Sequence, residues 1–123
     1  MKYSKIRNFR TRHLIIHPDY LQEFSYGQKW SDIPFPEIER VTIETYLNEG
    51  YNKIEPHRLE DPVRQDKYPD LICFHRRFYP KEPTWKNILK TLDKLIDDSG
   101  DHRHVFLEEL EVVGTSLYVS LGS

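Results

Sequence analysis

Two histidines, His102 and His104, stand one residue apart in the run DHRHVFLEEL, which spans residues 101–110 and is typical of a β-strand. Alternate residues of a strand point to the same side of a sheet. Neutral imidazoles on one side can therefore converge on a divalent cation together with a histidine from a neighbouring strand. The strand candidate 71–78 carries His75, so the sequence predicts a metal site formed by His75, His102 and His104.

The same alternation, applied to all strand candidates, predicts a histidine-rich open face on the sheet. Five of the six histidines would lie on this face: His13, His17, His75, His102 and His104. The face also carries side chains that are too apolar to stay exposed without a reason. The competing interpretation is therefore a protein interface, with a homodimer formed by stacking two sheets, or cover from residues 18–34. The predicted interface residues are His13, Ile15, Leu71 and Phe106.

The run HRHVFLEEL, residues 102–110, locally resembles the paired-histidine strand of the HUH endonucleases. In that family two histidines hold a divalent metal, and a tyrosine attacks single-stranded DNA. The resemblance implies a nucleophilic tyrosine, for which Tyr118 follows the pair and Tyr46 precedes it. Arg103 departs from the pattern, which has a bulky apolar residue between the two histidines.

The stretch HRRFYPK, residues 75–81, mixes basic and aromatic residues, as nucleic-acid-binding sheets often do. The expected order of elements resembles the topology of the RNA-recognition RRM domains, in which aromatics on the open sheet face stack on bases. Here the alternation places Phe74 and Phe78 on the helix-covered face instead. Nucleic acid is therefore an alternative partner and not the favoured one.

The clearest element that would position these groups is a helix over residues 84–100, TWKNILKTLDKLIDDSG. Its apolar residues recur on a single helical stripe: Trp85, Ile88, Leu89, Leu92, Leu95 and Ile96. Thr84 is expected to cap the first turn, and Gly100 can adopt the left-handed conformation that ends a helix. Asp97 and Asp98 lie at the negative end of the helix dipole, a conflict that the sequence alone does not explain.

Residues 36–49 are expected to form a second helix, because Pro36 suits a first turn and residues 48–50 resemble a stop signal. A strand is the alternative, since β-branched residues alternate with polar ones from Val41 to Leu47. Further strands are expected at 12–17, 51–55, 71–78, 104–112 and 117–121. This order predicts one α+β domain over 1–123, a ferredoxin-like βαββαβ sandwich with an extra C-terminal strand. Two helices would then cover one face of an antiparallel sheet.

Composition limits the classes of function. Eighteen basic and 20 acidic residues give a net charge of −2, which argues against general attraction to nucleic acid or anionic membranes. Only residues 1–11 form a basic arm. The apolar runs near the start are too short for a signal peptide or a membrane span, and the single cysteine fits a reducing compartment. We therefore expect a cytoplasmic protein without membrane contact, in which Cys73 is buried and unreactive.

The chain has no Gly-rich phosphate loop, CxxC pair, GxSxG or HExxH motif, so no catalytic residue and no cofactor other than a divalent metal is predicted. These features favour a small intracellular, non-enzymatic protein that acts, for example in regulation, through contacts with a partner protein or a second copy of itself. The alternative is a protein that binds a divalent metal, or processes single-stranded nucleic acid, with the histidine-rich face.

Overall fold

The computed structural model describes residues 11–16, 29–46 and 54–123, and every structural statement refers to these residues. Their helices and strands are, in chain order, β1 (Ile15–Ile16), β2 (Arg40–Tyr46), β3 (His57–Arg58), α3 (Pro62–Lys67), β4 (Leu71–Arg77), α4 (Trp85–Ser99), β5 (Phe106–Val113) and β6 (Ser116–Gly122). The six strands form one sheet in the order β1-β5-β6-β2-β4-β3. The α+β class is therefore confirmed.

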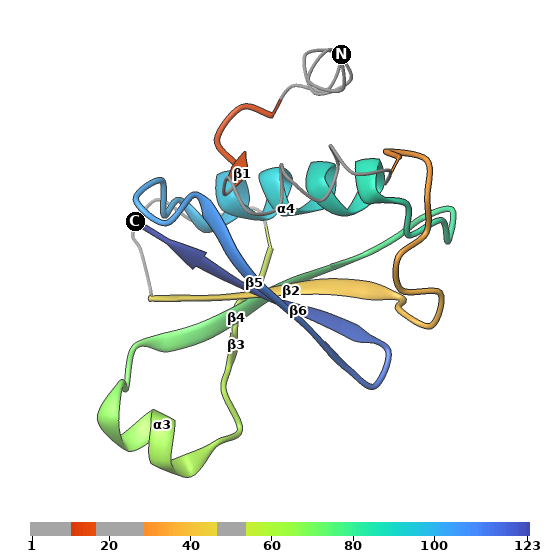
Figure 1. Ribbon diagram of the computed structural model, residues 1–123. Coiled ribbons are helices and arrows are strands. Elements are labelled where there is room, and N and C mark those ends of the chain that lie inside the picture. The colour runs from red at the N-terminus through yellow and green to blue at the C-terminus, as the bar shows by residue number, and fades with distance from the viewer. Residues whose placement is uncertain (1–10, 17–28, 47–53) are drawn as a thin grey trace.

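The sheet is mixed, and this differs from the antiparallel sheet that the sequence predicted. β1 runs parallel to β5, and β2 runs parallel to β6, while the other neighbouring strands are antiparallel. Helix α4 covers one face of the sheet, and α3 lies on the opposite side (Figure 1). The expected arrangement of two helices on one face is therefore not found, and neither is the ferredoxin-like order of elements.

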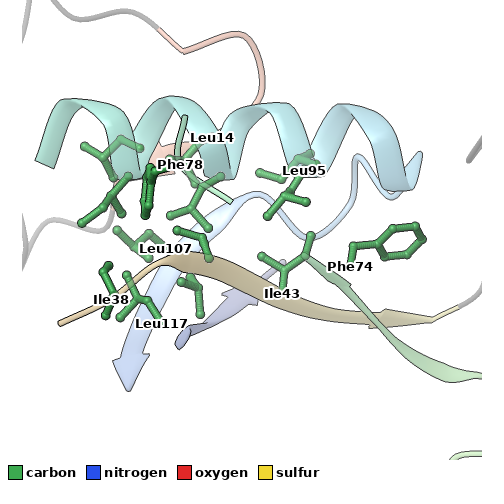
Figure 2. Packing of buried hydrophobic residues seen from close by; sticks show 14 of the residues in the cluster. Leu14, Ile38, Ile43, Phe74, Phe78, Leu95, Leu107 and Leu117 are labelled. Atoms are coloured by element: carbon green, nitrogen blue, oxygen red, sulfur yellow. The ribbon is translucent and has the colours of Figure 1, made fainter. Parts of the chain in front are cut away.

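Helix α4 forms where the sequence predicted it. The Thr84 hydroxyl accepts a hydrogen bond from the amide of Asn87 at 3.2 Å, and Gly100 ends the helix with φ of 74°. The apolar stripe of α4 packs on alternate residues of the strands (Figure 2). The largest fully buried side chains of this core include Ile43, Phe74, Ile88, Leu89, Leu92, Leu95, Leu107 and Leu117.

The predicted helix over residues 36–49 is wrong, since residues 40–46 form the strand β2. This strand lies between β6 and β4, where Val41 and Ile43 are almost completely buried under α4. β-branched side chains pack well on a pleated sheet and lose rotamer freedom in a helix, so burial in the sheet decides between the two conformations. Residues 47–49 lie outside the described part.

Helix α3 falls in a segment that the sequence left irregular. Its Ncap residue, Asp61, accepts hydrogen bonds from the amides of Val63 and Arg64, and Pro62 occupies the first turn. Both features favour the start of a helix. The strand expected at 51–55 lies largely outside the described residues, and the strand β3 is found at His57–Arg58 instead.

Candidate metal centre

Asp93, in the second half of α4, fastens the segment that precedes β1. Its carboxylate accepts hydrogen bonds from three successive backbone amides, those of Arg12 at 2.7 Å, His13 at 2.7 Å and Leu14 at 2.9 Å. Hydrogen bonds to an ionised carboxylate are stronger than those between neutral groups. The segment is also anchored by Leu14, which is buried in the core. Residues 12–14 are therefore held against α4.

This attachment brings His13 to Asp97, which lies one helical turn after Asp93 on the same flank of α4. The Nε2 atom of His13 is 3.3 Å from the Oδ1 atom of Asp97, and both side chains are half-buried. The ring of His102, which follows the end of α4, stacks on the ring of His13 with a centroid distance of 4.3 Å and an interplanar angle of 11°. The segment that carries His13 therefore meets the end of α4 and the turn that follows it, more than 80 residues later in the chain.

The ligand atoms of His13, Asp97 and His102 all lie within 4.8 Å of one another, and no other group of three such residues in the described ranges does so. Two ligand atoms of a tetrahedral zinc ion, each about 2.0–2.1 Å from the metal, are about 3.3 Å apart. The His13–Asp97 pair already has this spacing. His102 is exposed, so its ring is free to turn by the small amount that full coordination requires.

The structure does not bring together the three residues that the sequence combined as metal ligands. Of His75, His102 and His104, only His102 belongs to the cluster with His13 and Asp97. The alternation of a strand does not apply to His102 and His104, because β5 begins only at Phe106 and both residues lie in the preceding turn. His13 likewise precedes β1. The single histidine-rich face is therefore not formed.

His75 lies on β4, on the sheet face opposite α4. Its ring stacks on that of His57 from β3, with a centroid distance of 4.7 Å and an interplanar angle of 24°. Burial lowers the pKa of His75, and the nearby His57, Arg40 and Arg77 lower it further by charge repulsion. His75 therefore remains neutral at pH 7.

The four predicted interface residues do not form one exposed patch. His13 takes part in the cluster on α4, and Leu71 is only 5% exposed. Ile15 is 48% exposed and pairs in register with the partly exposed Phe106 on the neighbouring strand. A homodimer stays a prediction, and Ile15 is the clearest exposed apolar residue of the four. His17 lies outside the described residues.

The sequence-based prediction missed Asp97 as a candidate ligand, although it noted that Asp97 and Asp98 oppose the helix dipole. In the structure each of these carboxylates faces a cation or a group that can become one. Asp97 faces His13, and Asp98 accepts a hydrogen bond from the Nε of Arg76 at 2.8 Å. Carboxylates near the C-terminal end of a helix are unfavourable on their own. They therefore indicate that cationic side chains from other elements of the fold pair with them.

His104 is bound to a carboxylate rather than placed in the cluster. Its Nδ1 atom is 2.8 Å from the Oδ2 atom of Asp101, which also accepts hydrogen bonds from the Thr45 hydroxyl and, at 3.2 Å through its other oxygen, from the Arg103 amide. Burial acts to raise the pKa of Asp101, but the hydrogen bonds together outweigh it and lower the pKa. This network connects the end of α4 to β2 and holds the turn that carries His102.

We expect Asp101→Asn to lower the free energy of unfolding at neutral pH by about 1.5–3 kcal/mol, because a hydrogen-bonded carboxylate is lost. The pKa of Asp101 is lower in the folded protein than its ordinary value of 3.8. The stabilisation is therefore complete above that value and is lost as the pH falls through the lower pKa of the folded state. Urea denaturation should show the difference from wild type shrinking as the pH falls below about 4, toward the lower pKa of the folded state. A pH-independent difference would contradict this role.

Cys73 is buried, as the sequence predicted. Burial, with the nearby Glu44, raises the pKa of its thiol to about 12. The thiolate is the reactive form of cysteine, so Cys73 is an inert part of the packing at neutral pH.

The fold and the cluster define an α+β protein with a mixed six-stranded sheet, covered on one face by α4, and a His-Asp-His group at the C-terminal half of that helix. A scan against protein-family models finds no match, and searches of the curated proteins and of the solved structures find none. In the described part of the chain, neither helix is long and apolar enough to cross a membrane.

Proposed function

We propose that this protein binds a divalent transition-metal ion, with zinc as the best fit, through the imidazoles of His13 and His102 and the carboxylate of Asp97. The observation that carries the proposal is the approach of the three ligand atoms to within 4.8 Å of one another. Two imidazole nitrogens and a carboxylate oxygen form a donor set that suits zinc, with a fourth position left for water or a partner group.

The electrostatics of α4 support the same proposal. The last turns of a helix carry partial negative charge on their free carbonyl groups. Asp93, Asp97 and Asp98 add carboxylates to this region, and the last turn of α4 contains no basic residue. Arg76 forms an ion pair with Asp98, and the carboxylate of Asp93 accepts hydrogen bonds from the backbone amides of residues 12–14. A divalent cation bound by Asp97 and His13 would therefore lie in a region of negative potential.

The proposed role of the ion is structural and non-enzymatic. It would link residues 12–14, which lie about 80 residues earlier in the chain, to the end of α4 and to the turn that follows this helix. Binding energy that the folded state alone gains adds to its stability, so the ion would hold the N-terminal segment on the helix. The exposed Ile15 directly follows this segment, so the ion would also fix one surface on which contacts with another protein can be made.

We expect zinc to bind the wild-type protein at one site, with His13→Ala and His102→Ala each weakening it by more than the roughly 10–100-fold cost of losing an outer-shell partner. Isothermal titration calorimetry measures this directly. Affinity should also fall on acidification, because protons compete with the metal for imidazole nitrogens. His57→Ala is the matched control, since His57 is exposed and lies on the other side of the sheet.

Equal and weak zinc binding by wild type, His13→Ala and His102→Ala would contradict the proposal. So would a loss of binding in His57→Ala that the other two variants do not share. A second measurement is the shift in melting temperature on adding zinc, which should be present in wild type and absent in His13→Ala.

A further inference from the structure

A group of positive side chains lines a cavity on another flank of α4, between this helix and the end of β4. The cavity has a volume of about 420 Å³, within the range of small-molecule sites. Its lining includes Arg77 from β4 and, from α4, four polar residues at the spacing of one helical stripe: Asn87, Lys90, Thr91 and Lys94. We propose that this cavity binds a free nucleotide, with its phosphates at the basic residues and its base on the exposed ring of Tyr79.

The charge of the cavity supports an anionic ligand. Arg76 also lines it but is compensated by Asp98, and the charge of Arg77 acts on Glu39, whereas Lys90 and Lys94 have no carboxylate partner among the residues that the structure describes. Glu82 is the one acidic residue in the lining. Two uncompensated lysines, with Arg77 at the edge of the same cavity, favour a compact anionic group such as a di- or triphosphate in a protein with a net charge of −2.

The exposure of Tyr79 at the cavity is the second observation. It indicates that the ligand carries an aromatic group. Tyr79 is among the residues that line the cavity, and the residue is 99% exposed. An exposed aromatic ring beside basic groups is the arrangement on which nucleic-acid bases stack. The basic and aromatic residues of the stretch 75–81 therefore converge at this cavity, although Phe78 itself is in the core.

Small size distinguishes a free nucleotide from a nucleic-acid strand. A strand needs a charged groove that follows several phosphates, and its binding depends steeply on salt. Lys90 and Lys94 line a single cavity of about 420 Å³, which is the size of a small-molecule site. The near-neutral chain also offers no general attraction to a polyanion.

The test is binding of ATP and of inorganic triphosphate, measured by calorimetry in EDTA so that the proposed metal centre is not involved. We expect Lys90→Ala and Lys94→Ala each to weaken both ligands by roughly 10-fold or more, since each removes a charge-assisted hydrogen bond. Tyr79→Ala should weaken ATP by roughly 5–100-fold and leave triphosphate unchanged, because stacking concerns only the base. Tyr79→Phe, which keeps the ring, should bind ATP as wild type does.

Lys86→Ala is the control, because Lys86 is an exposed lysine of α4 outside the lining, and it should bind as wild type does. All of these side chains are exposed or at the surface, so the variants are expected to fold. No binding of ATP, or equal binding by wild type and Lys90→Ala, would overturn the proposal. Tighter binding of a ten-nucleotide single strand than of ATP would overturn the assignment to a free nucleotide. His13→Ala should bind ATP normally, so this test fails or succeeds independently of the metal proposal.

Discussion

Arg76→Ala is expected to lower the free energy of unfolding by about 3–5 kcal/mol, because it leaves a buried carboxylate without its counter-ion. The side chain of Asp98 is completely buried, whereas that of Arg76 is 31% exposed. The guanidinium binds one carboxylate oxygen through both Nε and a terminal nitrogen. The other oxygen, Oδ1, has no hydrogen-bond partner among the described residues, so no second group can replace the arginine.

Replacing both partners tests whether the loss of stability comes from the missing ion pair or from the buried carboxylate that Arg76→Ala leaves without a counter-ion. The double variant Arg76→Ala, Asp98→Ala leaves no isolated charge in the core and should be more stable than Arg76→Ala alone. Arg77→Ala, at the exposed neighbouring position, is the control and should change stability by no more than about 0.5 kcal/mol. Urea denaturation followed by circular dichroism measures all three. A loss below about 1 kcal/mol in Arg76→Ala would show that Asp98 is not held as described.

Leu92→Ala is expected to lower the free energy of unfolding by about 2–5 kcal/mol, through lost burial and the cavity that remains. Leu92 is fully buried in the middle of α4, among core residues from the helix and the sheet. Lys86→Ala, on the exposed side of the same helix, should stay within about 0.5 kcal/mol of wild type. Chemical denaturation of both variants is the measurement. A loss under about 0.5 kcal/mol in Leu92→Ala would mean that α4 does not pack on the sheet in solution.

The part of the fold that the sequence predicted correctly depends on local patterns. Helix α4 repeats its apolar residues over four turns and carries its own N-cap and C-cap, so neighbouring residues suffice to specify it. The strands β4, β5 and β6 were found near their expected positions for the same reason, since turn signals flank short apolar runs. The burial of Cys73 was predicted correctly from the apolar residues on either side of it.

The segment 40–46 shows where local patterns fail. Its residues fit both a short helix and a strand, and the decision comes from pairing with β6 on one side and β4 on the other. Those partners are 25 or more residues away in the chain, with Leu71 paired to Tyr46 and Leu117 paired to Val41. Because β2 is a strand, the helix predicted over residues 36–49 is not formed, and within the described residues α4 alone covers that face of the sheet.

The sequence by itself determined that this protein has histidines near the ends of elements, a carboxylate pair that opposes the dipole of α4, and a core stripe on that helix. Only the tertiary structure decided which of these groups meet. The hydrogen bonds from residues 12–14 to Asp93 place His13 beside Asp97, and the turn after α4 places His102 on His13. Strand alternation predicts direction only within a strand, and these histidines lie in connecting segments. Their positions therefore depend on long-range hydrogen bonds and packing, which residue spacing along the chain does not encode.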